Sequence, residues 1–101
     1  MITEIAQIDV TPGMESQFES GVREAVPLFE RARGYIGMEL QRSIEVPNRY
    51  LLLVQWQTLE NHTVDFRNSA DFQEWRRLVG HCFARPPEVE HTRRIELQQG
   101  G

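Results

Sequence analysis

Apolar residues recur at two spacings along this chain, and the spacings predict four strands and three helices. Strand-like sequence, with apolar residues at or near every second position, occupies residues 2–10, 35–45, 49–57 and 89–97. Helical spacing, with apolar residues every third or fourth position, falls between Gly13 and Gly34, over 59–67 and over 70–83. The predicted order is strand–helix–strand–strand–helix–helix–strand.

The first helix is the most regular of the three. Its apolar face is made of Phe18, Val22, Ala25, Phe29 and Ala32. Pro27 lies inside this pattern, and because proline lacks an N–H we expect a kink there. Gly34 supplies a residue type that commonly ends helices.

Polar residues that cap helices mark the starts of the other two. Thr58 precedes the helix over 59–67, with Glu60 in its first turn, and Ser69 precedes the helix over 70–83. The predicted buried face of the last helix is Phe72, Trp75, Val79 and Phe83. Pro86 and Pro87 then end that helix.

The strand over 49–57 is apolar on both faces. Leu52 and Trp56 point one way, with Tyr50 and Val54, and Leu51 and Leu53 point the other. Such a strand lies in the middle of a structure or at a subunit contact. Pro47-Asn48 is a turn signal that joins it in a hairpin to the strand before it.

The whole order predicts an α+β ferredoxin-like sandwich (β-α-β-β-α-α-β), an antiparallel sheet with its helices on one face. A second copy stacked on the bare face would form a homodimer.

Composition limits the alternatives. The 101 residues suffice for one domain, with a core over about 2–97 and a polar, frayed tail over 98–101. The net charge of −4 argues against nucleic-acid binding, which needs a cationic face. We expect no membrane association, since no apolar run approaches the ~20 residues that span a bilayer, and residues 1–10 lack a signal-peptide pattern. The lone Cys82, expected to be buried on a helix, indicates a reducing cytoplasm.

Three segments carry a resemblance to a known family. They are VTPGMESQFES, GYIGMELQRSIEVPNRYLLLVQW and WQTLENHTVDFRNSADFQEWR, the last followed by PPEVEH. Together they resemble the antibiotic biosynthesis monooxygenase (ABM) domain family over about residues 2–97. The resemblance implies a dimeric α+β barrel, with a pocket between sheet and helices in each subunit. It also implies, as an activity, the oxidation of phenolic, quinol or polycyclic aromatic compounds by O2 without a metal or organic cofactor.

Matching single residues to the aromatic-oxidising members of that family defines a candidate site. Trp56 matches a Trp that ends their third strand, and Arg76 matches an Arg in the helix that follows. His62 stands where those enzymes have a pocket Tyr, and Leu52 stands where they have a pocket Asn. The missing Asn weakens the match to their particular substrates.

The heme-degrading relatives match poorly. Their first-strand Asn, ring-distorting Trp and proximal His fall at Ala6, Phe66 and Arg76. The resemblance therefore excludes heme degradation. None of His62, His81 and His91 lies within five residues of another, so no closely spaced zinc-type pair is present.

Oxidation by O2 without a cofactor requires a substrate anion, and therefore a base, a group that stabilises the anion, and a dry slot. The predicted catalytic residues are His62, as the base, and Arg76, as the anion stabiliser. The alternatives are a histidine on the helix surface or at a subunit contact, and an Arg76 paired with Glu74 or Asp71.

The predicted substrate-binding residues are Trp56, Leu52, Phe66, Phe72 and Tyr50. Trp56, Phe66 and Phe72, with Trp75, are equally compatible with a plain core role. Asn61 is a weaker candidate. His91 alternates with Val89 on the last strand, and we expect it at a dimer seam rather than in the pocket.

Three hypotheses follow: a cofactor-independent monooxygenase, a small-molecule binding or detoxification module that uses the same pocket, and a structural dimer without a ligand. A basic group inside the apolar slot distinguishes the first from the third.

Overall fold

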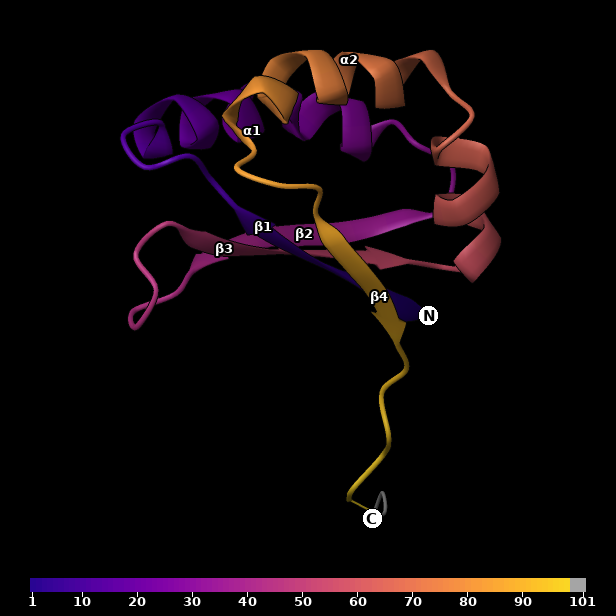
Figure 1. Cartoon of the computed structure of the whole chain (residues 1–101). Coiled ribbons are helices and arrows are strands. Elements are labelled where there is room, and N and C mark those ends of the chain that lie inside the picture. The colour runs from indigo at the N-terminus through magenta and orange to yellow at the C-terminus, as the bar shows by residue number, and fades with distance from the viewer. Residues whose placement is uncertain (99–101) are drawn as a thin grey trace.

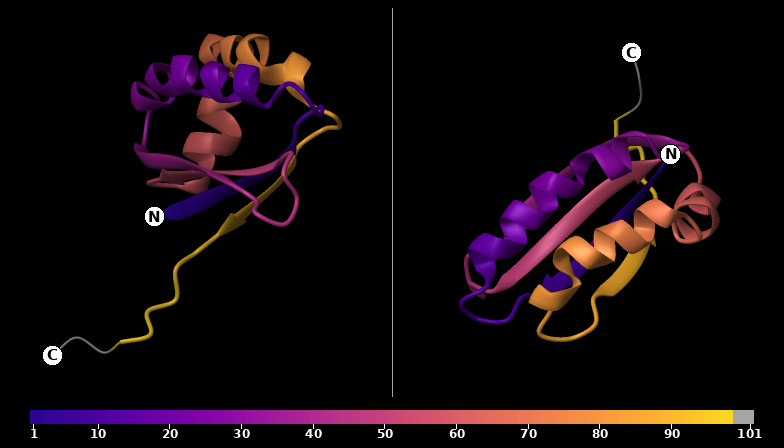
Figure 2. Two further views of the ribbon diagram at one scale, coloured as in Figure 1. Left: turned by 90° about the vertical axis from the view of Figure 1, so that its left-hand side faces the viewer. Right: turned by 90° about the horizontal axis from the view of Figure 1, so that it is seen from above.

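The computed structural model describes residues 1–98 and has two layers, a sheet and the helices above it (Figure 1). The elements in chain order are β1 (Ile2–Asp9), α1 (Glu15–Glu30), β2 (Tyr35–Arg42), β3 (Arg49–Trp56), η1 (Asn61–Phe66), α2 (Ala70–Val79), η2 (Gly80–Cys82) and β4 (Glu88–Thr92). The strands are antiparallel in the order β2-β3-β1-β4, so the strand that is apolar on both faces is central, as predicted. Helices α1 and α2 lie across one sheet face, and η1 stands at one end of it (Figure 2). The ferredoxin-like prediction is confirmed.

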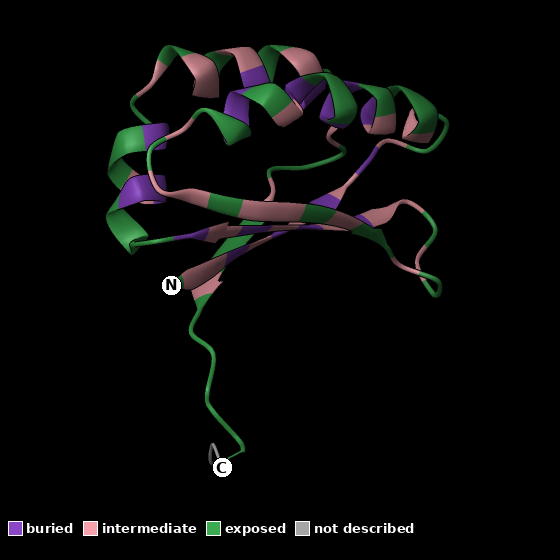
Figure 3. Cartoon of the chain, turned by 180° about the vertical axis from the view of Figure 1, so that it is seen from behind, coloured by how far each residue is buried: buried purple, intermediate pink, exposed green. Residues whose placement is uncertain are grey.

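The core fills the space between the two layers. Alternate residues of β1 and β3 face the helices and are buried, while buried and exposed positions also alternate along α1 and α2 (Figure 3). The largest fully buried side chains are Trp56, Tyr50, Phe18, Phe29, Ile8 and Leu52. Cys82 is fully buried, as predicted.

Helix α1 continues through Pro27 to Glu30, and the chain then turns at Gly34, whose φ of +80° suits glycine. The helix packs closely on α2 at Gly21. A Cβ there would lie 2.8 Å from the carbonyl oxygen of Leu78, so only glycine permits this approach. The two helices are thereby held together above the sheet.

Both predicted caps are present. Thr58 and Asn61 exchange hydrogen bonds at the start of the helical segment: the Asn61 N–H donates to Thr58 Oγ1 and the Thr58 N–H donates to Asn61 Oδ1. Residues 59–60 are α-helical, but 61–66 form a π-helical turn that the apolar spacing does not reveal. Ser69 Oγ accepts from the Phe72 N–H and starts α2. The predicted helix over 70–83 is wrong at its end, since α2 stops at Val79 and a 3₁₀ turn follows.

The last strand is shorter than predicted. It covers Glu88–Thr92 instead of 89–97, because β1 starts at Ile2 and its Thr3 already pairs with Thr92. Residues beyond Thr92 therefore have no strand beside them, and the chain leaves the body of the protein (Figure 1). The predicted tail, from residue 99 onward, lies outside the described residues. The strand predicted over 35–45 likewise ends earlier, at Arg42.

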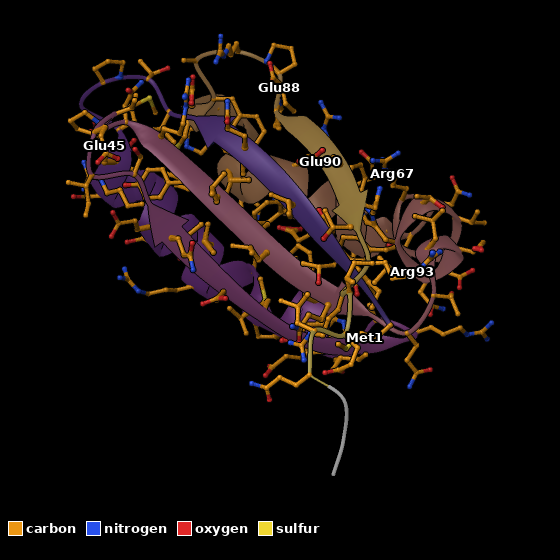
Figure 4. The ribbon with its side chains drawn as sticks, turned by 90° about the horizontal axis from the view of Figure 1, so that it is seen from below. Met1, Glu45, Arg67, Glu88, Glu90 and Arg93 are labelled. Carbon is orange, nitrogen blue, oxygen red and sulfur yellow. The ribbon has the colours of Figure 1, made fainter. Side chains whose placement is uncertain are left out.

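Among the described residues, no helix covers the second sheet face. Figure 4 shows this face, with Glu88 and Glu90 of β4 labelled and Arg67 beyond the strand edge. Ile5, Leu51 and Leu53 lie on it half-buried. No helix in the part of the chain described is long and apolar enough to span a membrane.

Candidate functional site

A cavity of about 650 Å³ lies between the helix-facing side of the sheet and α2. Three strands and the segment after η2 contribute to its wall. The lining residues are Glu4, Ala6, Ile8, Leu52, His62, Arg67, Phe72, Trp75, Arg76, Phe83, Arg85, Pro86, Pro87 and Val89. The wall therefore joins an apolar slot to a small set of charged groups.

Glu4 is a buried carboxylate on the core-facing side of β1, only 5% exposed. It shares that side with Ala6 and Ile8 because residues two apart in a strand point the same way. Its Oε1 accepts a hydrogen bond of 3.0 Å from the Trp56 indole Nε1–H. Burial raises the pKa of Glu4 to about 7, although the Trp56 hydrogen bond and the charge of Arg67 act in the opposite direction.

His62, on η1, is buried beside that carboxylate. Its ring stacks on Trp56 with centroids 5.6 Å apart, and its Nε2 lies 3.3 Å from Glu4 Oε1. Its Nδ1 lies 2.8 Å from Nε2 of His91. Burial, and then the charges of Arg67 and His91, lower the pKa of His62 to about 4. The ring is therefore neutral at physiological pH, and both of its nitrogens already face a partner.

His91 reaches His62 from β4, and the expectation that it faces a dimer seam is wrong. It lies opposite Glu4 in the β1–β4 ladder, so its side chain points to the helix side of the sheet. Burial, and then the charge of Arg67, lower the pKa of His91. Glu4, His62 and His91 thus form a continuous chain of polar groups, and Trp56 packs against its centre.

Arg76 lies on the exposed rim of the cavity, with its guanidinium 6.0 Å from the centre of the Phe72 ring. The expected alternative, a pairing with Asp71 or Glu74, is not observed. Asp71 pairs with Arg31, and Glu74 pairs with Arg77. Among residues 1–98 no ion pair involves Arg76, so its charge is available to a ligand.

The predicted substrate-binding residues fall into two groups. Leu52 and Phe72 line the cavity. Trp56 and Phe66 do not: Trp56 lies behind His62, and Phe66 packs against Trp56 in the core, with ring centroids 5.5 Å apart. These two support the site from behind.

Tyr50 does not line the cavity that holds His62. It shares a strand face with Trp56, but six residues of strand separate the two by about 20 Å. Its hydroxyl donates to Glu19 Oε2 at 2.6 Å, in a separate hollow of about 540 Å³ between α1 and β2. Burial, followed by the hydrogen bond to Glu19, raises the pKa of Tyr50 to about 12. Asn61 also lies outside the lining, since its side chain caps the helical segment.

Glu4, Arg67 and Arg85 line the cavity although pattern reasoning did not select them. For Glu4 a signal existed, because a carboxylate two residues before Ala6 occupies a core-facing position of the first strand. Arg85 is paired with Asp9 at 2.7 Å, which holds it at the mouth of the cavity. Within residues 1–98 no three His, Cys, Asp or Glu side chains are grouped to hold a metal ion.

Comparisons with known proteins agree with the fold and identify the family of the chain. A model of the antibiotic biosynthesis monooxygenase family matches residues 1–78. The uncharacterized protein YczJ of Bacillus subtilis is 41% identical over 91 residues, which cover 90% of this chain and 96% of YczJ. A crystal structure from Bordetella bronchiseptica, assigned as an antibiotic biosynthesis monooxygenase, is 61% identical with a TM-score of 0.93, over 94% of this chain and 97% of that one.

A more distant match concerns the fold alone. SnoaB, a cofactor-independent oxygenase from Streptomyces nogalater, superposes with a TM-score of 0.77 at 20% identity, over 97% of each chain.

Proposed function

Because this chain belongs to the antibiotic biosynthesis monooxygenase family, we propose that it oxidises a small aromatic, phenolic or quinol-type compound with O2 and without a metal or organic cofactor. One observation carries the proposal. The cavity between sheet and helices contains a buried carboxylate–imidazole pair, Glu4 and His62, beside apolar walls. A purely structural dimer would gain nothing from such a pair, since burying titratable groups costs free energy.

The chemistry requires that the substrate be ionised first. O2 accepts electrons one at a time, and a phenolate or the carbanion conjugated to it gives them up far more easily than the neutral molecule does. For a ring CH2 group activated in this way, one oxygen atom becomes the C=O of the product. The two hydrogens leave with the second oxygen atom as water, so that the substrate supplies all four electrons that O2 takes.

The residues around the cavity suit this sequence of events. The Glu4–His62 pair takes the proton at the inner end, and Arg76 at the rim stabilises the resulting anion. Leu52 and Phe72 supply apolar contact for the ring, and their exclusion of water strengthens both electrostatic effects. Trp56 keeps the His62 ring in place by stacking on it.

The proposal is tested by O2 consumption with a panel of hydroquinones and anthrone-type compounds. We expect turnover by the unaltered protein, a loss of about tenfold or more in His62→Ala at pH 7, and no change in His81→Ala, whose histidine is exposed and outside the lining. Labelled ¹⁸O2 should place one oxygen atom in the product. Equal rates in His62→Ala would remove the residue from the mechanism. If no compound is turned over but phenols raise the melting temperature, the protein is a binding module.

We also propose a homodimer formed through the bare sheet face, where Ile5, Leu51 and Leu53 are half-buried. Light scattering after size exclusion should give twice the chain mass, and Leu51→Asp should reduce it to the mass of one chain. Val64→Asp, at an exposed position of η1, is the matched control. A monomeric unaltered protein would refute the dimer.

A cytoplasmic location is also part of the proposal, because the only cysteine is buried and free.

A further inference from the structure

We infer that Glu4, and not His62, is the group that takes the proton from the bound substrate, while His62 and His91 hold its carboxylate in position. This inference rests on the proposed function and assigns the roles within the same cavity. It concerns a residue that neither the strand pattern nor the family resemblance selected.

Neither ring nitrogen of His62 is free to face a substrate. Its Nδ1 is 2.8 Å from His91 Nε2, and its Nε2 is 3.3 Å from Glu4 Oε1. A general base must place a free lone pair within hydrogen-bond reach of the proton that it removes. Nδ1 is within hydrogen-bond distance of His91, and Nε2 faces Glu4, so neither nitrogen is directed at a ligand in the cavity.

Glu4, by contrast, has one carboxylate oxygen engaged and one free. Oε1 accepts from Trp56 and faces His62, whereas Oε2 has no hydrogen-bond partner among residues 1–98. No side-chain oxygen that is fully buried in this part of the protein lacks a partner. Oε2 is therefore accessible, and since Glu4 lines the cavity, the atom is accessible from there.

The electrostatic surroundings suit a carboxylate base that works near neutral pH. Burial makes Glu4 a stronger base than an ordinary carboxylate, with its pKa raised to about 7, so a large fraction is ionised at that pH and the ionised form binds protons well. Its charged and titratable neighbours around the cavity and along the polar chain are His62, Arg67, Arg76, Arg85 and His91.

The step itself is a single proton transfer. The O–H bond of the phenol breaks, its electron pair stays on the phenolic oxygen, and the proton bonds to Glu4 Oε2. Arg76 at the rim then faces the new anion. Trp56 and His62 hold Oε1, so the carboxylate does not rotate away from the substrate.

Glu4→Gln tests the assignment with little disturbance, because the amide oxygen can replace Oε1 while the amide nitrogen replaces the free Oε2. We expect its turnover to fall by about 10² or more, with histidine ¹⁵N resonances that still report the neutral ring of His62. Glu24→Gln, at an exposed position of α1, should keep full turnover. In Glu4→Ala, added formate should raise the turnover rate at least tenfold, and added imidazole should not.

His62→Phe separates the base from the residue that positions it. It retains a ring against Trp56 but removes the N–H near Oε1, so the acid limb of the kcat/KM profile should move to higher pH, with turnover above that limb within about tenfold of the unaltered protein. A Glu4→Gln rate within threefold of the unaltered protein, or a larger loss in His62→Phe than in Glu4→Gln, overturns the assignment.

A measurement without O2 keeps this inference separate from the proposed function. Hydroquinone binding is followed under argon from pH 5.5 to 8.5 by calorimetry. Because a carboxylate accepts a stronger hydrogen bond than a carboxylic acid, the Kd should fall by about fivefold as Glu4 ionises, and in Glu4→Gln it should stay constant. The same pH dependence in both proteins refutes the contact. If the Kd shows the predicted pH dependence but no compound is turned over, only the proposed oxidation is refuted.

Discussion

Glu4→Gln also offers a test of the buried carboxylate through stability alone, without any substrate. In the unfolded chain Glu4 ionises near its ordinary pKa of 4.5, but in the folded protein burial raises this pKa to about 7. Between these values the folded protein holds a proton that the unfolded chain has lost. The stabilisation associated with that proton is present in full below pH 4.5 and is lost as the pH rises to 7.

The magnitude follows from the size of the shift. One pKa unit corresponds to about 1.4 kcal/mol, so a rise from 4.5 to about 7 removes about 3 kcal/mol across this window. Glutamine has no proton to lose there. We therefore expect the unfolding free energy of Glu4→Gln, relative to that of the unaltered protein, to rise by about 3 kcal/mol between pH 4.5 and 8. Any further difference that the amide introduces should be the same at every pH.

His62 gives the unaltered protein an opposite slope. Its pKa falls from 6.5 to about 4 on folding, so its contribution is present above pH 6.5 and is lost as the pH falls to 4. In the unaltered protein the two slopes nearly cancel between pH 4.5 and 6.5. In Glu4→Gln the opposing Glu4 slope is removed, and the stability that His62 contributes should rise by about 3 kcal/mol from pH 4 to 6.5.

Urea unfolding at pH 4.5, 5.5, 6.5 and 8, at one protein concentration, measures both profiles. Glu24→Gln removes an exposed carboxylate from α1, and its difference from the unaltered protein should vary by less than about 1 kcal/mol. If the difference for Glu4→Gln also stays constant within that range, the carboxylate is not held in the buried state described above.

Three further changes test the packing and the surface. Gly21→Ala places a Cβ 2.8 Å from the Leu78 carbonyl oxygen and should lower the unfolding free energy in urea by about 1–3 kcal/mol. Gly80→Ala, whose new Cβ would have nothing within 4 Å, should leave the unfolding free energy unchanged or raise it by up to about 1 kcal/mol. Equal effects of the two substitutions would contradict the close helix contact. Phe29→Ala removes a ring that is 1% exposed and should lower the unfolding free energy by about 3–5 kcal/mol, and a loss under 1 kcal/mol would contradict its place in the core. Asp9→Asn breaks contacts to Arg49 and Arg85 and should cost about 1 kcal/mol or less, with a smaller effect in 1 M NaCl; a cost independent of salt would argue against ion pairing.

Local patterns sufficed for most of the fold because they depend on neighbours in the chain. The alternation in the first strand indicated which side faces the core, and Thr58 and Ser69 marked two helix starts by their own side-chain chemistry. The end of β4 depends instead on where β1 runs out of residues, which is a long-range property of the register. The π-helical turn of residues 61–66 similarly has no signature in apolar spacing.

The candidate site was accessible to sequence reasoning only in part. Spacing along the chain and the family resemblance selected His62 and Arg76, which line one cavity. They also selected Tyr50, whose hydroxyl instead donates to Glu19 in a separate hollow. Glu4 and His91 were missed or misplaced, since their roles come from a contact between β1, β4 and η1 that no single segment encodes.

Strand β4 has a consequence for how the protein exchanges protons with its surroundings. It is the outermost strand on its side, it pairs with β1 over only five residues, and it carries His91. Edge segments of this kind detach in brief local openings that require far less free energy than global unfolding. Each such opening would separate the two imidazoles and admit water to the interior carboxylate while the helices and central strands stay intact. The protonation of the innermost group would then re-equilibrate at the rate at which the sheet margin loosens.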